Sequence, residues 1–103
     1  MEKNTPHYDL AVIKADVRRL GKYGFTGSAL SSAFGLGFTL DQAQETVFGL
    51  QRCMLYKSMT SYDDHRVWQD VYHTQSRGLE IYIKVTYRSD GKPPVISFKE
   101  KNT

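Results

Sequence analysis

The chain has little of what metal and disulfide chemistry requires. Its 103 residues include one cysteine, Cys53, and three scattered histidines. A single cysteine excludes a disulfide framework and a cysteine-based zinc site, and the histidines show no metal-ligand spacing. We therefore expect chemistry that uses no metal and no cofactor. Cys53 itself is expected to be an inert core residue.

Long apolar runs are also missing. Residues 23–40 are an uncharged run of 18 residues, but they include four glycines and five serines or threonines. Such a segment is a poor transmembrane helix. The opening residues MEKNTPHYDL contain no apolar stretch typical of a secretory signal. The sequence therefore predicts a cytoplasmic protein that does not enter the membrane.

Basic residues are absent from residues 23–50, which carry only Asp41 and Glu45. Residues 51–103, in contrast, hold nine Lys or Arg and six Asp or Glu, and the net charge of the whole chain is +3. The positive charge is thus concentrated in the C-terminal half and in the region before residue 23. This distribution favours an anionic partner such as a nucleic acid.

The most regular pattern is the alternation of apolar and polar side chains in residues 79–88, LEIYIKVTYR. A period of two predicts a strand with one buried and one solvent-facing side. The Asp90-Gly91 pair that follows indicates a hairpin, although the nearby prolines leave a longer loop as an alternative. With these turn residues, the cross-strand pairs are Tyr82 with Lys99, Ile83 with Phe98, and Lys84 with Ser97. A phenol and two ammonium groups on one exposed patch predict a surface that handles phosphate.

The rest of the chain predicts three helices followed by strands. Asp9 caps a helix over residues 10–20 that Gly21 ends, a second helix spans about 26–34, and a third begins at a Thr39–Gln42 capping box. Strands are expected at residues 54–60, 67–73, 79–88 and 95–99, with loops at 61–66 and 74–78. This order predicts a single α+β domain over residues 1–103, in which an antiparallel sheet of about four or more strands packs against the helices.

Four segments carry a resemblance to a known family: MEKNTPH at the start, YKSMTSYDDHRVWQDVY at residues 56–72, IYIK around Tyr82, and VISFKEK at 95–101. Together they resemble the MqsR family of mRNA-cleaving toxins from type II toxin–antitoxin pairs, which have a RelE-like fold. The resemblance spans nearly the whole chain, and the long block at 56–72 is specific. It implies an endoribonuclease that acts on single-stranded mRNA, often at the ribosome in the wider fold family. It also implies a cognate MqsA-type antitoxin.

The catalytic residues that the resemblance implies are Lys57, Gln69, Tyr82 and Lys99. The expected reaction is attack of a 2′-OH on the adjacent phosphate, which needs a base, an acid and charge stabilisation. We assign Lys57 and Tyr82 to proton transfer without choosing the acid, Lys99 to phosphate charge, and Gln69 to substrate orientation. A basic Lys57 needs a lowered pKa, which neighbouring cations and burial would supply.

Tyr56, Trp68 and Lys84 are the candidates for RNA binding, through base stacking and phosphate contact. His65 and His73 have the residue type of a ribonuclease acid–base pair, but they lie outside the set that the resemblance implies, and we set them aside. The alternative hypothesis is a non-catalytic nucleic-acid-binding module or a regulator that acts by protein interaction.

Overall fold

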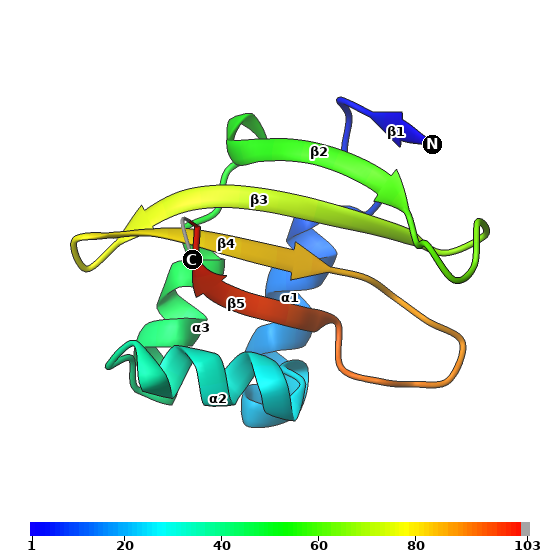
Figure 1. The fold of residues 1–103 in the computed structure, drawn as a ribbon. Helices are drawn as coiled ribbons and strands as arrows, with labels where there is room; N and C mark the ends of the chain where they lie inside the picture. Colours follow the sequence, from blue (N-terminus) through cyan, green and yellow to red (C-terminus); the bar gives the residue numbers. More distant parts are fainter. Residues whose placement is uncertain (102–103) are drawn as a thin grey trace.

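A computed structural model describes residues 1–101 as a five-stranded antiparallel sheet with three helices against one face (Figure 1). The helices are α1 (Leu10–Leu20), α2 (Gly27–Gly35) and α3 (Leu40–Phe48), with short 3-10 turns η1 (Gly21–Gly24) and η2 (Arg52–Met54). The strands, which lie in chain order across the sheet, are β1 (Glu2–Lys3), β2 (Leu55–Thr60), β3 (Trp68–Ser76), β4 (Leu79–Val85) and β5 (Val95–Glu100). The predicted α+β class is confirmed, and the arrangement is consistent with a RelE-like fold. The sequence did not predict β1.

Each helix begins where the sequence supplies a capping side chain. The Asp9 carboxylate accepts a hydrogen bond from the Ala11 amide at 2.9 Å, and the Thr26 hydroxyl accepts one from the Ala29 amide at 3.2 Å. At α3 both hydrogen bonds of the predicted Thr39–Gln42 capping box are present. These caps satisfy backbone N–H groups that the first helical turn leaves without partners. The predicted helix starts are confirmed.

The pairing of β4 with β5 has the predicted register, whereas the connection between them differs from the prediction. Tyr82 pairs with Lys99, Ile83 with Phe98, and Lys84 with Ser97. Asp90-Gly91 is not a two-residue hairpin turn, because the strands are joined by a loop of residues 86–94. Inside this loop Gly91 has a φ of 76°, and its amide donates a hydrogen bond to the Arg88 carbonyl that forms a local turn. A register shift between Lys84 and Val85 accommodates the longer connection.

The tight hairpin lies instead between β3 and β4, at Arg77 and Gly78. Both residues have positive φ, 52° and 82°, which is the conformation of a type I′ turn. The prediction of a loop at residues 74–78 was therefore wrong, since β3 continues to Ser76. The extension pairs Thr74, Gln75 and Ser76 with β4, and His73, the last residue of the predicted strand, pairs with Tyr82.

The core fills the space between the sheet and the helices. Ile81, Ile83 and Val85 of β4 are fully buried on this side together with Ile13 and Val17 of α1. Outside this core, Cys53 is exposed, so its expected core position was wrong. No helix within residues 1–101 combines the length and apolar character that crossing a membrane would require.

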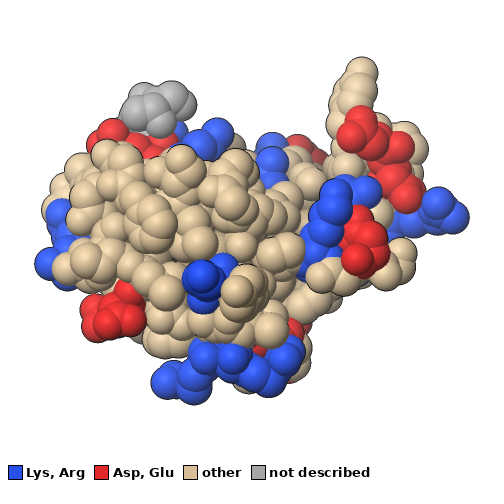
Figure 2. All heavy atoms as spheres, turned by 90° about the horizontal axis from the view of Figure 1, so that it is seen from below, with Lys and Arg blue, Asp and Glu red and all other residues tan. Residues whose placement is uncertain are grey.

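The surface on the helix side carries few charges. Figure 2 views the molecule from that side and shows a broad, largely uncharged area with most Lys and Arg at its rim. Tyr23 and Phe34 are exposed hydrophobic residues of this region, 68% and 52% accessible. The opposite side of the sheet, away from the helices, is called the open face below.

Candidate functional site

Two rows of paired residues cross the open face and bring together most of the predicted site. One row runs from Lys57 on β2 through Val71 on β3 and Lys84 on β4 to Ser97 on β5. The neighbouring row contains His73, Tyr82 and Lys99. Because alternate residues of a strand point to opposite faces, these side chains share the face away from the core. We call the five titratable members of this group the open-face cluster: Lys57, His73, Tyr82, Lys84 and Lys99.

Tyr82 lies at the centre of the open-face cluster. The Lys99 and Lys84 ammonium nitrogens are 4.9 Å and 5.9 Å from the centroid of its ring. Burial raises the pKa of Tyr82 above its ordinary value, although the positive charges of Lys99 and Lys57 oppose this effect. The phenol therefore holds its proton at neutral pH and is available as a hydrogen-bond donor.

Lys57 is held by the N-terminal strand. Its ammonium nitrogen lies 3.0 Å from a carboxylate oxygen of Glu2 on β1. This hydrogen bond raises the pKa of Lys57 above its ordinary value. The direction is opposite to the lowering expected for a basic Lys57, because sequence reasoning did not find β1 and its carboxylate. Lys57 is therefore a positive charge on the open face.

Tyr56 also reaches the open face, because the β2–β3 register shifts between Leu55 and Lys57. Its ring stacks on the imidazole of His73, with centroids 4.3 Å apart and planes inclined by 18°. His73 in turn lies 5.8 Å from the Tyr82 ring. His73 was set aside because it lies outside the set that the resemblance implies, and its pairing with Tyr82 across β3 and β4 was not predicted.

The structure separates two predicted residues from this centre. Gln69 is on the open face but pairs with Met59, beyond Val71 along β3. Trp68 points to the other face, where its ring stacks on His7 at 5.1 Å and lies 4.2 Å from the Lys3 ammonium. Trp68 is thus packed against N-terminal residues, away from Tyr82.

Comparison with known proteins assigns the family. Residues 5–100 match the sequence model of a family described as "Motility quorum-sensing regulator, toxin of MqsA". A curated relative, the mRNA interferase toxin MqsR of Escherichia coli K12, is 42% identical over 101 residues, which cover 98% of this chain and all of the relative. The chain belongs to the MqsR toxin family.

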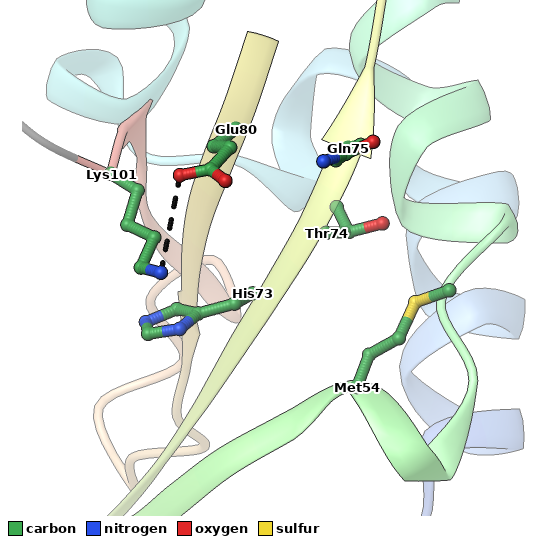
Figure 3. A pocket seen from close by; sticks show the side chains of 6 residues that line it. All are labelled: Met54, His73, Thr74, Gln75, Glu80 and Lys101. Atoms are coloured by element: carbon green, nitrogen blue, oxygen red, sulfur yellow. Dashed lines mark ion pairs between the residues drawn. The ribbon is translucent and has the colours of Figure 1, made fainter.

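In this member of the MqsR family, a pocket adjoins the open-face cluster. Its volume is about 360 Å³, and it is lined by Met54, His73, Thr74, Gln75, Glu80 and Lys101. Figure 3 shows the His73 imidazole on the same side as the Lys101–Glu80 ion pair, with Thr74 and Met54 toward α3. The pocket forms where β3 extends beyond its last pair with β2, Tyr72 with Leu55. His73 thus lies between the pocket and Tyr82.

The pKa of His73 is lowered from its ordinary value. Burial is the main cause and the positive charge of Lys101 adds to it, whereas Glu80 acts in the opposite direction. The imidazole of this MqsR-family chain is therefore neutral at neutral pH and can accept a proton. Across residues 1–101, no three His, Cys, Asp or Glu side chains gather as a potential metal site.

Proposed function

We propose that this chain is an mRNA interferase, a toxin endoribonuclease that cleaves single-stranded mRNA at the open face of its sheet. The observation that carries the proposal is the open-face cluster, in which three lysine side chains surround one protonated phenol. Family membership supports it, since the E. coli relative is named an mRNA interferase toxin. The three ammonium groups are suited to bind an RNA phosphate, and the rings of Tyr56 and Tyr82 are suited to contact its bases.

The proposed reaction is an attack of the ribose 2′-oxygen on the adjacent phosphorus. The O2′–P bond forms, the P–O5′ bond breaks, and the products are a 2′,3′-cyclic phosphate and a 5′-OH. Tyr82 donates a proton to the leaving 5′-oxygen, because its raised pKa keeps the phenol protonated. Lys57 and Lys99 stabilise the negative charge on the phosphate oxygens.

The remaining predicted residues bind and orient the RNA. Lys84 contacts a neighbouring phosphate, and Tyr56, 56% exposed, offers its ring to a base. Gln69 donates a hydrogen bond to substrate from the far end of the same face. Trp68, whose ring is stacked on His7, contributes to RNA binding only through the position of β3.

A cleavage assay with Tyr82→Phe tests the proposed function. Purified protein is incubated with end-labelled single-stranded RNA in the presence of EDTA, and the products are analysed for cyclic phosphate ends. We expect discrete cyclic-phosphate products from the wild type and a rate at least about 100-fold lower for Tyr82→Phe, the usual contribution of a general acid. RNA affinity should change little, because the phenyl ring keeps its place between the lysines.

The matched control is Tyr62→Phe, which removes the same hydroxyl from a side chain that is 98% exposed. It should cleave at the wild-type rate. Equal rates for the wild type and Tyr82→Phe would overturn the role of Tyr82. RNA binding without cleavage by the wild type would instead favour the alternative, a non-catalytic binding module.

We also propose two macromolecular partners and a location. An MqsA-type antitoxin is the protein partner, as the family description "toxin of MqsA" supports. The second partner is the ribosome, which presents the mRNA. The proposed location of the protein is the cytoplasm, where ribosomes translate mRNA. Growth arrest upon expression that a co-expressed MqsA-type protein relieves would support the pairing. Unrelieved arrest would count against it.

A further inference from the structure

The proposed reaction needs a base that removes the 2′-OH proton, and the expected residues do not supply it. Tyr82 has a raised pKa and is protonated at neutral pH. Lys57 has a raised pKa because it is hydrogen-bonded to Glu2, and it is charged. Neither group is able to accept a proton at the start of the reaction.

We propose that His73 is the catalytic base of this chain, accepting the 2′-OH proton on one side of the phosphate while Tyr82 protonates the 5′-oxygen on the other. This inference rests on the proposed function and adds a residue to it. It follows from three geometric facts: the pairing of His73 with Tyr82 across β3 and β4, the stacking of its ring on Tyr56, and its place in the wall of the pocket.

The two rings lie close enough together for both to face one phosphate bound over them. Their centroids are 5.8 Å apart and their planes are inclined by 41°, so they do not stack. Tyr56 stacks on His73 at 4.3 Å and fixes the orientation of the imidazole. The pocket of about 360 Å³ leaves the imidazole accessible to a nucleotide. The site thus has a positioned base that substrate can reach.

The titratable groups around His73 come from three strands and the segment after β5. They are Tyr56 and Lys57 of β2, Glu80 and Tyr82 of β4, Lys99 of β5, and Lys101. Burial and Lys101 lower the pKa of His73, and Glu80 opposes them. Carboxyl groups ordinarily titrate near pH 4, and phenols and ammonium groups near pH 10. Because an imidazole starts from an ordinary pKa near 6.5, the lowered pKa of His73 leaves its ring neutral at neutral pH.

Lys84 is the other group of the open-face cluster with a lowered pKa. Burial is the main cause and Lys57 adds to it. A lysine starts from an ordinary pKa near 10.4, however, whereas an imidazole starts near 6.5 and is already suited to accept a proton at neutral pH. Lys84 also lies in the other row of the open face, paired with Ser97.

Each proton has a defined path in this scheme. The His73 imidazole takes the proton from the 2′-OH as the O2′–P bond forms, and it becomes an imidazolium ion. The Tyr82 phenol gives its proton to the 5′-oxygen as the P–O5′ bond breaks. The imidazolium then returns a proton, through solvent, to the tyrosinate, which restores both residues.

The first test compares the pH–rate profiles of wild type and His73→Phe. Phenylalanine keeps an aromatic ring on Tyr56 but cannot accept a proton. The wild-type kcat should fall in acid, with a midpoint below the ordinary imidazole value of about 6.5, because protonation removes the base and the pKa of His73 is lowered. His73→Phe should lose this limb and cleave about 100-fold or more slowly, with KM changed only a few-fold. His65→Phe, the same change in an exposed loop residue, should retain the wild-type profile.

The second test separates base from acid with an RNA that carries sulfur at the 5′-bridging position of one linkage. A thiolate leaves without a proton, so this substrate should restore cleavage to Tyr82→Phe but not to His73→Phe. His73→Gln serves as a second variant if His73→Phe folds poorly, as judged by circular dichroism. An unchanged pH–rate profile in both His73 variants, beside an active wild type, would overturn the base assignment and leave the proposed function intact. An inactive wild type would overturn the proposed function itself.

Discussion

Asp70 is a buried carboxylate that fixes the N-terminal segment to the sheet. It is 0% exposed, and its oxygens accept hydrogen bonds from the Ser58 hydroxyl at 2.6 Å and the Tyr8 amide at 2.9 Å. The His7 amide donates to both oxygens, at 3.1 and 3.0 Å. A buried charge is tolerated because these donors replace its water shell. Asp70 thus holds the segment that follows β1, the strand that supplies Glu2 to Lys57.

We predict that Asp70→Asn lowers the free energy of unfolding by about 2–3 kcal/mol, because an amide group then faces donors and leaves some of them without an acceptor. Urea denaturation measures the change. Asp63→Asn, the same substitution at an exposed position, should change the stability by less than about 0.5 kcal/mol. A similar loss in both variants would contradict the role of the buried network. Sequence alone did not reveal this network, because two of its donors, the His7 and Tyr8 amides, come from about 60 positions away.

The β3–β4 hairpin is the element that aligns the proposed base with the proposed acid. Its turn residues Arg77 and Gly78 have positive φ, and the turn sets the register that pairs His73 with Tyr82. Hairpin register depends on turn geometry, and a slip of one residue would move His73 to the opposite face. The turn therefore matters for activity although it lies at the end of the sheet.

We predict that Gly78→Ala destabilises the protein by about 1–2 kcal/mol, because an L-residue disfavours φ 82°. The control is Gly27→Ala at the start of α2, where an added Cβ meets nothing within 4 Å. That substitution should stabilise the protein by about 0.5 kcal/mol, since alanine loses less chain entropy on folding. Thermal melts of the two variants should shift in opposite directions. Two shifts of the same sign would contradict the assignment of this turn.

The sequence predicted elements where local signals are strong. Asp9, Thr26 and Thr39 mark the helix starts through capping side chains that need no distant partner. The β4–β5 register was also predicted, although its turn was not. β3 was predicted too short because its last residues, Thr74–Ser76, are polar and resemble a loop; the pairing with β4 outweighs their low strand propensity. His73, the last residue of the predicted strand, was left out of the predicted site for another reason: the register of β3 on β4, which pairs it with Tyr82, was not predicted.

The two sides of the molecule differ in charge. On the helix side, the surface of α2 and α3 is largely uncharged, because residues 23–50 contain no Lys or Arg, and the basic residues in Figure 2 lie mostly around this area. The basic residues of this side belong to α1 and η1: Lys14, Arg18, Arg19 and Lys22. The open face carries Lys57 on β2, Lys84 on β4 and Lys99 on β5. An RNA strand attracted by its phosphates should therefore bind to the open face rather than over α2. The net charge of +3 alone does not reveal this separation.

Salt dependence measures how many phosphates this face contacts. Each contact between a protein cation and a phosphate of single-stranded RNA contributes about −0.7 to the slope of log K against log salt concentration. We predict that Lys84→Gln reduces the magnitude of this slope by about 0.7, because it removes one such cation. Lys14→Gln removes the same charge from α1, on the helix side, and should leave the slope unchanged. The measurement uses fluorescence anisotropy with a 2′-O-methyl RNA, which has no free 2′-OH and is not cleaved. Equal changes of the slope in both variants would mean that RNA is bound by the overall charge of the protein. That result would contradict the open face as the binding surface.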